Sequence, residues 1–129
     1  MTHPTEGSAH TRRATTRLRQ LVSRPLCTVA PGVADALAAR LVALEGFDAV
    51  YMTGFGTSLT RLGAPDVGLL TAGEMIDNAG RIVDASGLPV IADADTGYGN
   101  PINVRRTVRD YEKAGVAAIH IEDQVWPKR

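Results

Sequence analysis

The sequence has almost no cysteine and no long apolar run. Cys27 is the single cysteine among 129 residues, which excludes an internal disulfide framework and suits a reducing cytoplasm. No apolar run approaches the ~20 residues of a membrane-spanning helix, and the polar start of the chain has no secretory core. Lysine plus arginine equal aspartate plus glutamate at 14 each, so no basic surface for nucleic acid is indicated. We therefore expect a cytoplasmic protein without a nucleic-acid or membrane partner.

Two kinds of segment alternate along most of the chain. Residues 1–14 contain almost no large apolar side chain, and we predict a flexible leader there. Helical periodicity and short apolar runs then follow each other in turn. Helices are predicted over about 15–23, 33–45, 71–86 and 102–114, and strands over 25–30, 47–53, 88–92 and 116–121. A glycine-rich connection is predicted over 54–68. Cys27 lies in the first predicted strand, where we expect a buried small hydrophobe.

This order of elements predicts an α/β fold with a parallel sheet. A doubly wound open sheet and a (β/α)8 TIM-type barrel both fit. No Gly-x-Gly-x-x-Gly turn follows the first predicted strand, which disfavours the dinucleotide-binding form of the open sheet. A barrel needs ~250 residues, so residues 15–129 are expected to form its N-terminal half, about the first four strands.

Acidic side chains follow two consecutive predicted strands. Asp93 and Asp95 end one strand and share a face by alternation, as do His120 and Glu122 on the next. Adjacent strands lie ~4.8 Å apart, so Asp93, Asp95 and Glu122 are expected to converge at the carboxyl-terminal mouth. Such carboxylates repel one another unless a cation lies between them. Oxygen ligands favour Mg²⁺, or Mn²⁺ as an alternative, over zinc. The other interpretation is that these acids only cap a helix or pair with lysine.

A second group of residues follows the strand at 47–53. Thr53, Gly54 and Phe55 begin a stretch in which backbone amides freed by glycine lie beside hydroxyl groups. That combination is typical of an anion-binding loop, and a substrate carboxylate is the expected occupant. An ordinary flexible connection explains the same residues, and both interpretations stay open.

Several longer motifs are much more specific than these spacings. They are Gly46–Tyr51 (GFDAVY), Gly63–Gly68 (GAPDVG), Leu88–Gly99 (LPVIADADTGYG), Ala114–Gln124 (AGVAAIHIEDQ) and Lys128–Arg129. Together they resemble the isocitrate lyase / phosphoenolpyruvate mutase superfamily over roughly residues 18–129.

The resemblance implies a barrel whose magnesium is held by Asp93 and Asp95, with Glu122 in the shell, often through water. It also implies that Thr53, Gly54 and Phe55 grip a substrate carboxylate, with Phe55 narrowing the pocket because it replaces a smaller residue. Further active-site residues are implied at Asp66, Glu122, Lys128 and Arg129. The lyases of this superfamily continue after Lys-Arg with a catalytic cysteine on a mobile loop, so the chain, which ends at Arg129, is expected to be inactive alone.

The implied function is a magnesium-dependent carbon–carbon lyase with a small-molecule substrate. The substrate class is a 2-hydroxy- or 2-oxo-dicarboxylate, such as methylisocitrate, dimethylmalate or oxaloacetate, cleaved through a pyruvate enolate-type intermediate. Phosphoenolpyruvate mutase-type phosphoryl transfer and a catalytically incompetent truncated chain are the alternatives. The resemblance also implies a homotetramer for the full-length protein.

Overall fold

The computed structural model describes residues 13–126 and Lys128. Its elements follow the order α1 (Ala14–Val22), β1 (Gly32–Val33), α2 (Ala36–Leu44), β2 (Val50–Met52), α3 (Gly54–Leu62), α4 (Ala72–Ser86), β3 (Val90–Asp93), α5 (Pro101–Lys113) and β4 (Ala118–His120). The predicted leader lies outside the described residues, except for Arg13 and Ala14. None of the helices in the described part of the chain is long and apolar enough to cross a membrane.

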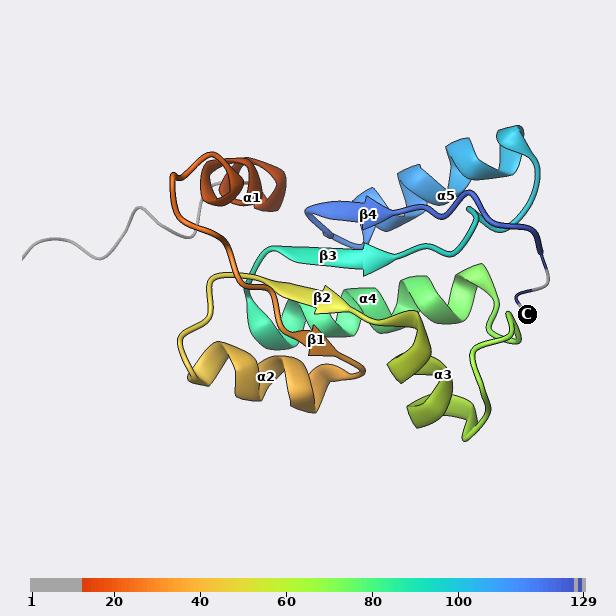
Figure 1. The fold of residues 1–129 in the computed structure, drawn as a ribbon, viewed down its shortest axis with the longest axis horizontal. Helices are drawn as coiled ribbons and strands as arrows, with labels where there is room; N and C mark the ends of the chain where they lie inside the picture. Colours follow the sequence, from red (N-terminus) through yellow and green to blue (C-terminus); the bar gives the residue numbers. More distant parts are fainter. Residues whose placement is uncertain (1–12, 127, 129) are drawn as a thin grey trace, which may run out of the picture.

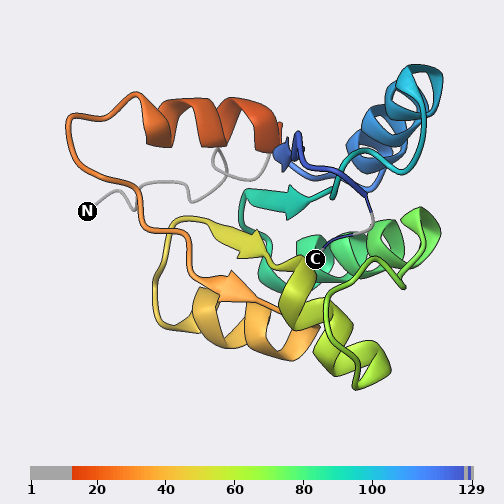
Figure 2. The same ribbon diagram turned by 45° about the vertical axis from the view of Figure 1, so that its right-hand side comes forward.

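The four strands form one parallel sheet in the order β1-β2-β3-β4, which confirms the predicted parallel sheet. Figure 1 shows the strands pointing the same way, with α3 and the end of the chain gathered where the strands stop. Helix α1 lies at the opposite end of the sheet (Figure 2), where Arg17 donates a hydrogen bond to the carbonyl oxygen of Gly87. The register places Tyr51 opposite Ile91, and Asp93 opposite His120.

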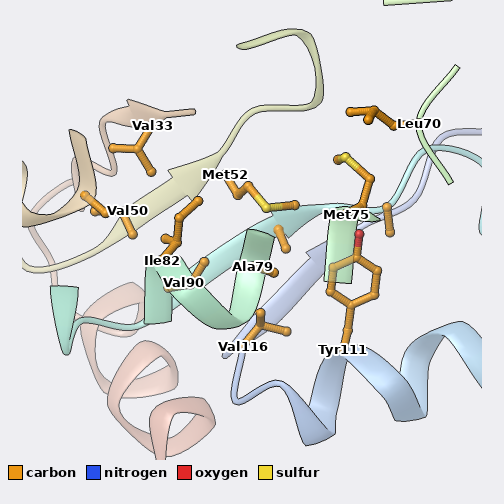
Figure 3. Close-up of a cluster of buried hydrophobic side chains, with 13 residues drawn as sticks. Val33, Val50, Met52, Leu70, Met75, Ala79, Ile82, Val90, Tyr111 and Val116 are labelled. Atoms are coloured by element: carbon orange, nitrogen blue, oxygen red, sulfur yellow. The ribbon is translucent and has the colours of Figure 1, made fainter. Parts of the chain in front are cut away.

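One face of the sheet is covered by helices and carries the hydrophobic core. Alternate strand residues, including Ala92, belong to this core. Figure 3 shows three of them, Val50, Met52 and Val90, among side chains of α4 and α5. The buried cluster also includes Val33, Ala39, Leu70, Met75, Ala79, Ile82, Ala94, Tyr111 and Val116. Burying each large apolar side chain contributes roughly 1.5–3 kcal/mol, so this face supplies most of the stabilisation.

The predicted first strand is wrong in position. The strand pairs at Gly32 and Val33 instead of at 25–30, because the carbonyl oxygens of Pro31 and Val33 accept the amides of Tyr51 and Thr53. The apolar run before Pro31 connects α1 to the sheet. Cys27 in that run is exposed, so the prediction that it is buried is also wrong.

Helix α2 confirms the periodicity but not its predicted start. Asp35 caps the helix by accepting a hydrogen bond from the amide of Ala38 at 2.8 Å, which places the first helical residue at 36. The small residues of this helix face the core: Ala39 is fully buried, and Ala38 and Val42 pack beside it. The leucines of this helix, whose spacing of three and four residues is helical, lie on the other side and are exposed: Leu37, Leu41 and Leu44.

The predicted glycine-rich connection contains a helix that the sequence did not indicate. Thr53 caps α3 at its beginning, and Gly63 ends it in the left-handed conformation with φ 61°. The other helices confirm their predictions. A capping box marks the start of α4 beside the predicted residue 71: the Thr71 hydroxyl accepts a hydrogen bond from the Glu74 amide, and the Glu74 carboxylate accepts one from the Thr71 amide.

Candidate metal centre

The carboxylate of Asp93 is fixed at the carboxyl end of β3. Its Oδ2 accepts a hydrogen bond from the Gly54 amide at 3.1 Å, and its Oδ1 accepts one from the Asp95 amide at 2.9 Å. Asp93 is only 6% exposed, and Tyr111 holds its backbone by donating a hydroxyl hydrogen bond to its carbonyl oxygen at 2.9 Å. Donors on both oxygens fix the orientation of a carboxylate.

Gly54 permits this arrangement because it has no side chain. A Cβ at this position would lie 2.5 Å from Oδ2 of Asp93, which is closer than real Cβ contacts allow. The predicted substrate-binding residues Thr53, Gly54 and Phe55 therefore lie at the beginning of α3, beside the site. The Thr53 hydroxyl accepts from the Gly56 amide at 3.2 Å, and Phe55 is 57% exposed. In this structure the amide of Gly54 donates its hydrogen bond to the Asp93 carboxylate.

Three side chains at and just beyond the ends of β3 and β4 meet closely enough to hold one ion. Ligand atoms of Asp93, His120 and Glu122 all lie within 4.8 Å of one another. Glu122 is positioned through its backbone amide, which donates to the carbonyl oxygen of Asp95 at 2.7 Å, and its carboxylate accepts from Gln124. Two of the three predicted metal ligands, Asp93 and Glu122, are thus brought together, with His120 beside them.

Asp95, the third predicted ligand, is placed by a turn. Because β3 ends at Asp93, strand alternation no longer applies at Asp95, whose backbone is left-handed with φ 45°. Its side chain is buried, and Oδ1 has no well-aligned hydrogen-bond donor among the described residues. The Nζ of Lys128 lies 2.7 Å from this oxygen, and the two side chains form an ion pair. A buried carboxylate oxygen without an aligned donor is one that a cation can satisfy.

Lys128 contacts two other predicted catalytic residues, Asp66 and Glu122. Its Nζ lies 3.0 Å from a carboxylate oxygen of Asp66 and 3.6 Å from one of Glu122. Burial by itself lowers the pKa of Lys128, but the pairing of its ammonium with Asp95 and Asp66 outweighs burial and raises that pKa, so the side chain stays charged. Arg129, the remaining predicted catalytic residue, lies outside the described residues.

Tyr51 is a site residue that the sequence interpretation missed. Its hydroxyl lies 3.1 Å from Nδ1 of His120, on the face of the sheet away from the core. Burial, and then the charges of Asp93 and Glu122, raise the pKa of Tyr51 to about 12, so the phenol stays neutral at physiological pH. Strand alternation carried a signal for it, since Tyr51 and Ile91 are paired in the register and Asp93 is two residues beyond Ile91.

The donor chemistry of this site fits a hard divalent cation. The carboxylates of Asp93, Asp95 and Glu122 offer oxygen ligands, which magnesium and manganese prefer. The fixed orientation of Asp93 and the buried oxygen of Asp95 are what a preformed oxygen site requires.

Comparison with known proteins decides the family. The family model described as phosphoenolpyruvate phosphomutase matches residues 18–129. The chain belongs to this family. The match places the chain in the isocitrate lyase / phosphoenolpyruvate mutase superfamily and confirms the resemblance.

The relatives include enzymes of different named activities. A 2,3-dimethylmalate lyase from Eubacterium barkeri is 60% identical over 113 residues, which cover 88% of this chain and 39% of that protein. A structure of oxaloacetate acetylhydrolase with the product oxalate matches with a TM-score of 0.85 and 47% identity, covering 90% of this chain and 41% of that one. A phosphonopyruvate hydrolase complexed with oxalate and Mg²⁺ matches with a TM-score of 0.85 and 31% identity, covering 92% of this chain and 41% of that one.

The family match also confirms the fold class. The chain is an α/β, parallel-sheet part of a TIM-type barrel, and it spans about 39% of the length of the dimethylmalate lyase. The described carboxylates lie where barrel enzymes place their chemistry, at the carboxyl ends of the strands.

Proposed function

We propose that this chain supplies the metal-binding half of a magnesium-dependent carbon–carbon lyase that acts on a 2-hydroxy- or 2-oxo-dicarboxylate. The observation that carries the proposal is the Asp93 carboxylate, fixed by two backbone amides within 4.8 Å of Glu122 and His120. The Mg²⁺ in the related phosphonopyruvate hydrolase structure supports the choice of ion.

The chain's own residues prepare the site for such a cation. Asp93 and Asp95 would hold the ion, with Glu122 in contact directly or through water. Magnesium, when bound, supplies a Lewis acid that polarises the substrate oxygens and stabilises negative charge developing on them. Gly54 keeps Asp93 in one orientation, and the neutral Tyr51 hydroxyl positions the ring of His120 toward the same space.

The proposed substrate class rests on the relatives. The names 2,3-dimethylmalate lyase and oxaloacetate acetylhydrolase both specify dicarboxylates that carry an oxygen on the second carbon. The dimethylmalate lyase is 60% identical, whereas a carboxyvinyl-carboxyphosphonate phosphorylmutase from Arabidopsis thaliana is 44% identical and the phosphonopyruvate hydrolase is 31% identical. We therefore favour carbon–carbon cleavage over phosphoryl transfer. Methylisocitrate, dimethylmalate and oxaloacetate are the substrates to screen.

Several further properties belong to the same proposal. Thr53, Gly54 and Phe55 would lie next to a substrate carboxylate, and Asp66 and Lys128 would line the same space. A homotetrameric full-length enzyme and a cytoplasmic location are part of the proposal as well. The chain spans about 39% of the dimethylmalate lyase, and we propose that alone it releases no pyruvate.

The test is pyruvate release by the full-length protein from the three substrates, with Mg²⁺ and with a chelator. We expect turnover of at least one substrate in Mg²⁺ only, and loss of that turnover in Asp93→Ala. Asp84→Ala removes an exposed carboxylate from α4 and serves as the matched control, with unchanged turnover. Retained activity in Asp93→Ala, or activity that persists in chelator, would contradict the proposal.

A further inference from the structure

Lys128 places a positive charge among the carboxylates of the proposed metal site. Its Nζ lies 2.7 Å from Asp95, 3.0 Å from Asp66 and 3.6 Å from Glu122, and its side chain is only 12% exposed. Side chains this close and this sheltered interact more strongly than exposed pairs, because water screens them less. The ammonium is thus the principal positive charge that these carboxylates face in the described part of the chain.

The same carboxylate oxygens cannot serve the ammonium and a divalent cation equally. Oδ1 of Asp95, which lies next to Nζ, is the buried oxygen that lacks an aligned hydrogen-bond donor. A metal ligand must direct a lone pair at the ion, and an ammonium within 2.7 Å competes electrostatically for that position. Binding of Mg²⁺ through these same oxygens of Asp95 and Glu122 therefore competes with their ion pairs to Lys128.

The segment that carries Lys128 is attached to the loop between α3 and α4. Trp126 lies directly over Gly68, where a Cβ would overlap the indole ring, and Lys128 pairs with Asp66 of the same loop. The Lys128 ammonium also lies 6.0 Å from the centre of the Trp126 ring. These contacts involve neither Asp95 nor Glu122. Lys128 can therefore leave those two residues and keep its contact with Asp66.

We propose that Lys128 is the internal counter-cation of the carboxylate cluster and competes with Mg²⁺ for Asp95 and Glu122, keeping Asp66 as its partner when it is displaced. This inference rests on the metal site of the proposed function. Binding of Mg²⁺ must break the ion pairs of Lys128 with Asp95 and Glu122, which reduces the net free energy of metal binding. The wild-type chain therefore binds Mg²⁺ more weakly than a chain without the ammonium.

The test is calorimetric titration of the 129-residue chain with MgCl₂. Lys128→Met removes the charge and keeps most of the side-chain length, and we expect Mg²⁺ to bind about tenfold more tightly, which corresponds to about 1.4 kcal/mol. Lys113→Met is the matched control, because Lys113 pairs with Asp110 on the outer surface of α5 and its loss should leave the affinity unchanged. Unchanged or weaker binding by Lys128→Met overturns the inference.

Two further variants separate charge from packing and protect the test against misfolding. Lys128→Gln is a second neutral variant and should also tighten Mg²⁺ binding, whereas Lys128→Arg keeps the charge and should bind close to the wild type. If Lys128→Arg tightens binding as much as Lys128→Met, charge competition is not the cause and the inference fails. If wild type and neutral variants all fail to bind Mg²⁺, the metal site itself is wrong and the proposed function falls with the inference.

A second readout does not depend on metal affinity. In chelator, the neutral variants leave the carboxylates without their ammonium, so we expect a lower midpoint of thermal unfolding than in the wild type. Saturating MgCl₂ should raise that midpoint more in Lys128→Met than in the wild type, since tighter binding gives greater stabilisation. An equal rise in both proteins would contradict competition even if both bind the ion.

Discussion

The two faces of the sheet differ in what their side chains do. On the face covered by α2, α4 and α5, alternate strand residues such as Val50 and Val90 are fully buried among apolar neighbours. On the other face, Tyr51 and His120 share a hydrogen bond, and Asp93 faces Gly54 at the strand end. Successive residues of one strand thus alternate between the core, where they stabilise the fold, and the opposite face, where they line the candidate metal centre.

The two faces also differ in how strictly they require particular residues. On the covered face, one apolar side chain can be replaced by another of similar size, because the free energy of burial depends on area and shape. The carboxylate site depends on particular atoms at particular distances, since each donor or ion partner of Asp93 or Asp95 meets a single oxygen. Substitutions on the two faces should therefore separate stability from metal binding.

The largest effect is expected on the covered face. Ile82 is fully buried, so Ile82→Ala should lower the free energy of unfolding by about 3 kcal/mol through lost burial and a cavity. Denaturant titration measures this change. Leu41→Ala, on the exposed side of α2 at 54% exposure, should change it by less than about 0.5 kcal/mol. Equal losses in the two variants would contradict the placement of the core.

The next effect is expected at the site. Gly54→Ala introduces a Cβ against Oδ2 of Asp93 and removes the fixed orientation of that carboxylate, so Mg²⁺ affinity should fall about 10–100-fold. Gly73→Ala is the control, since the nearest atom to a Cβ there, the Thr71 hydroxyl oxygen, is 4.0 Å away. That variant should bind Mg²⁺ normally. Calorimetric titration measures the affinity of both variants. Normal Mg²⁺ affinity in Gly54→Ala would contradict the role of Gly54 in orienting Asp93.

The smallest effect concerns the start of α4, which supports the covered face. Hydrogen bonds from the Thr71 amide and hydroxyl lower the pKa of Glu74. A lowered folded-state pKa means that its stabilising contribution is present above the ordinary pKa of 4.5 and is lost as the pH falls below it. Glu74→Gln should therefore show a shallower loss of stability than the wild type on acidification. Parallel acid-unfolding curves for the two proteins would show that Glu74 contributes nothing through its charge.

Features that depend on neighbouring residues were predictable from the sequence. The capping pair Thr71 and Glu74 are three residues apart, and the pattern alone identified the start of α4. The acidic residues at the carboxyl ends of β3 and β4 were also predictable, because the order of adjacent parallel strands brings Asp93 and Glu122 to the same edge of the sheet. The resemblance added Asp66 and Lys128, which the spacings did not indicate.

Features that depend on contacts between distant residues were not predictable. Gly54 and Asp93 are 39 residues apart, and Tyr51 and His120 are 69 apart, so nothing local indicates these contacts. The position of β1 was wrong for the same reason: pairing with β2, rather than the apolar run at 25–30, decides where the strand forms. Helix α3 was missed because its residues are glycine- and threonine-rich, and its capping residues outweigh that poor composition.

The central claim is that the carboxylates at the ends of β3 and β4 gather around one divalent cation. The most direct measurement is a crystal structure of the chain in MnCl₂, with the ion located by its anomalous scattering. We expect one manganese peak bound by Asp93 and Asp95, with Glu122 in contact directly or through water, and Lys128 withdrawn toward Asp66. A structure with Asp93 and Glu122 pointing apart and no peak between them would contradict it.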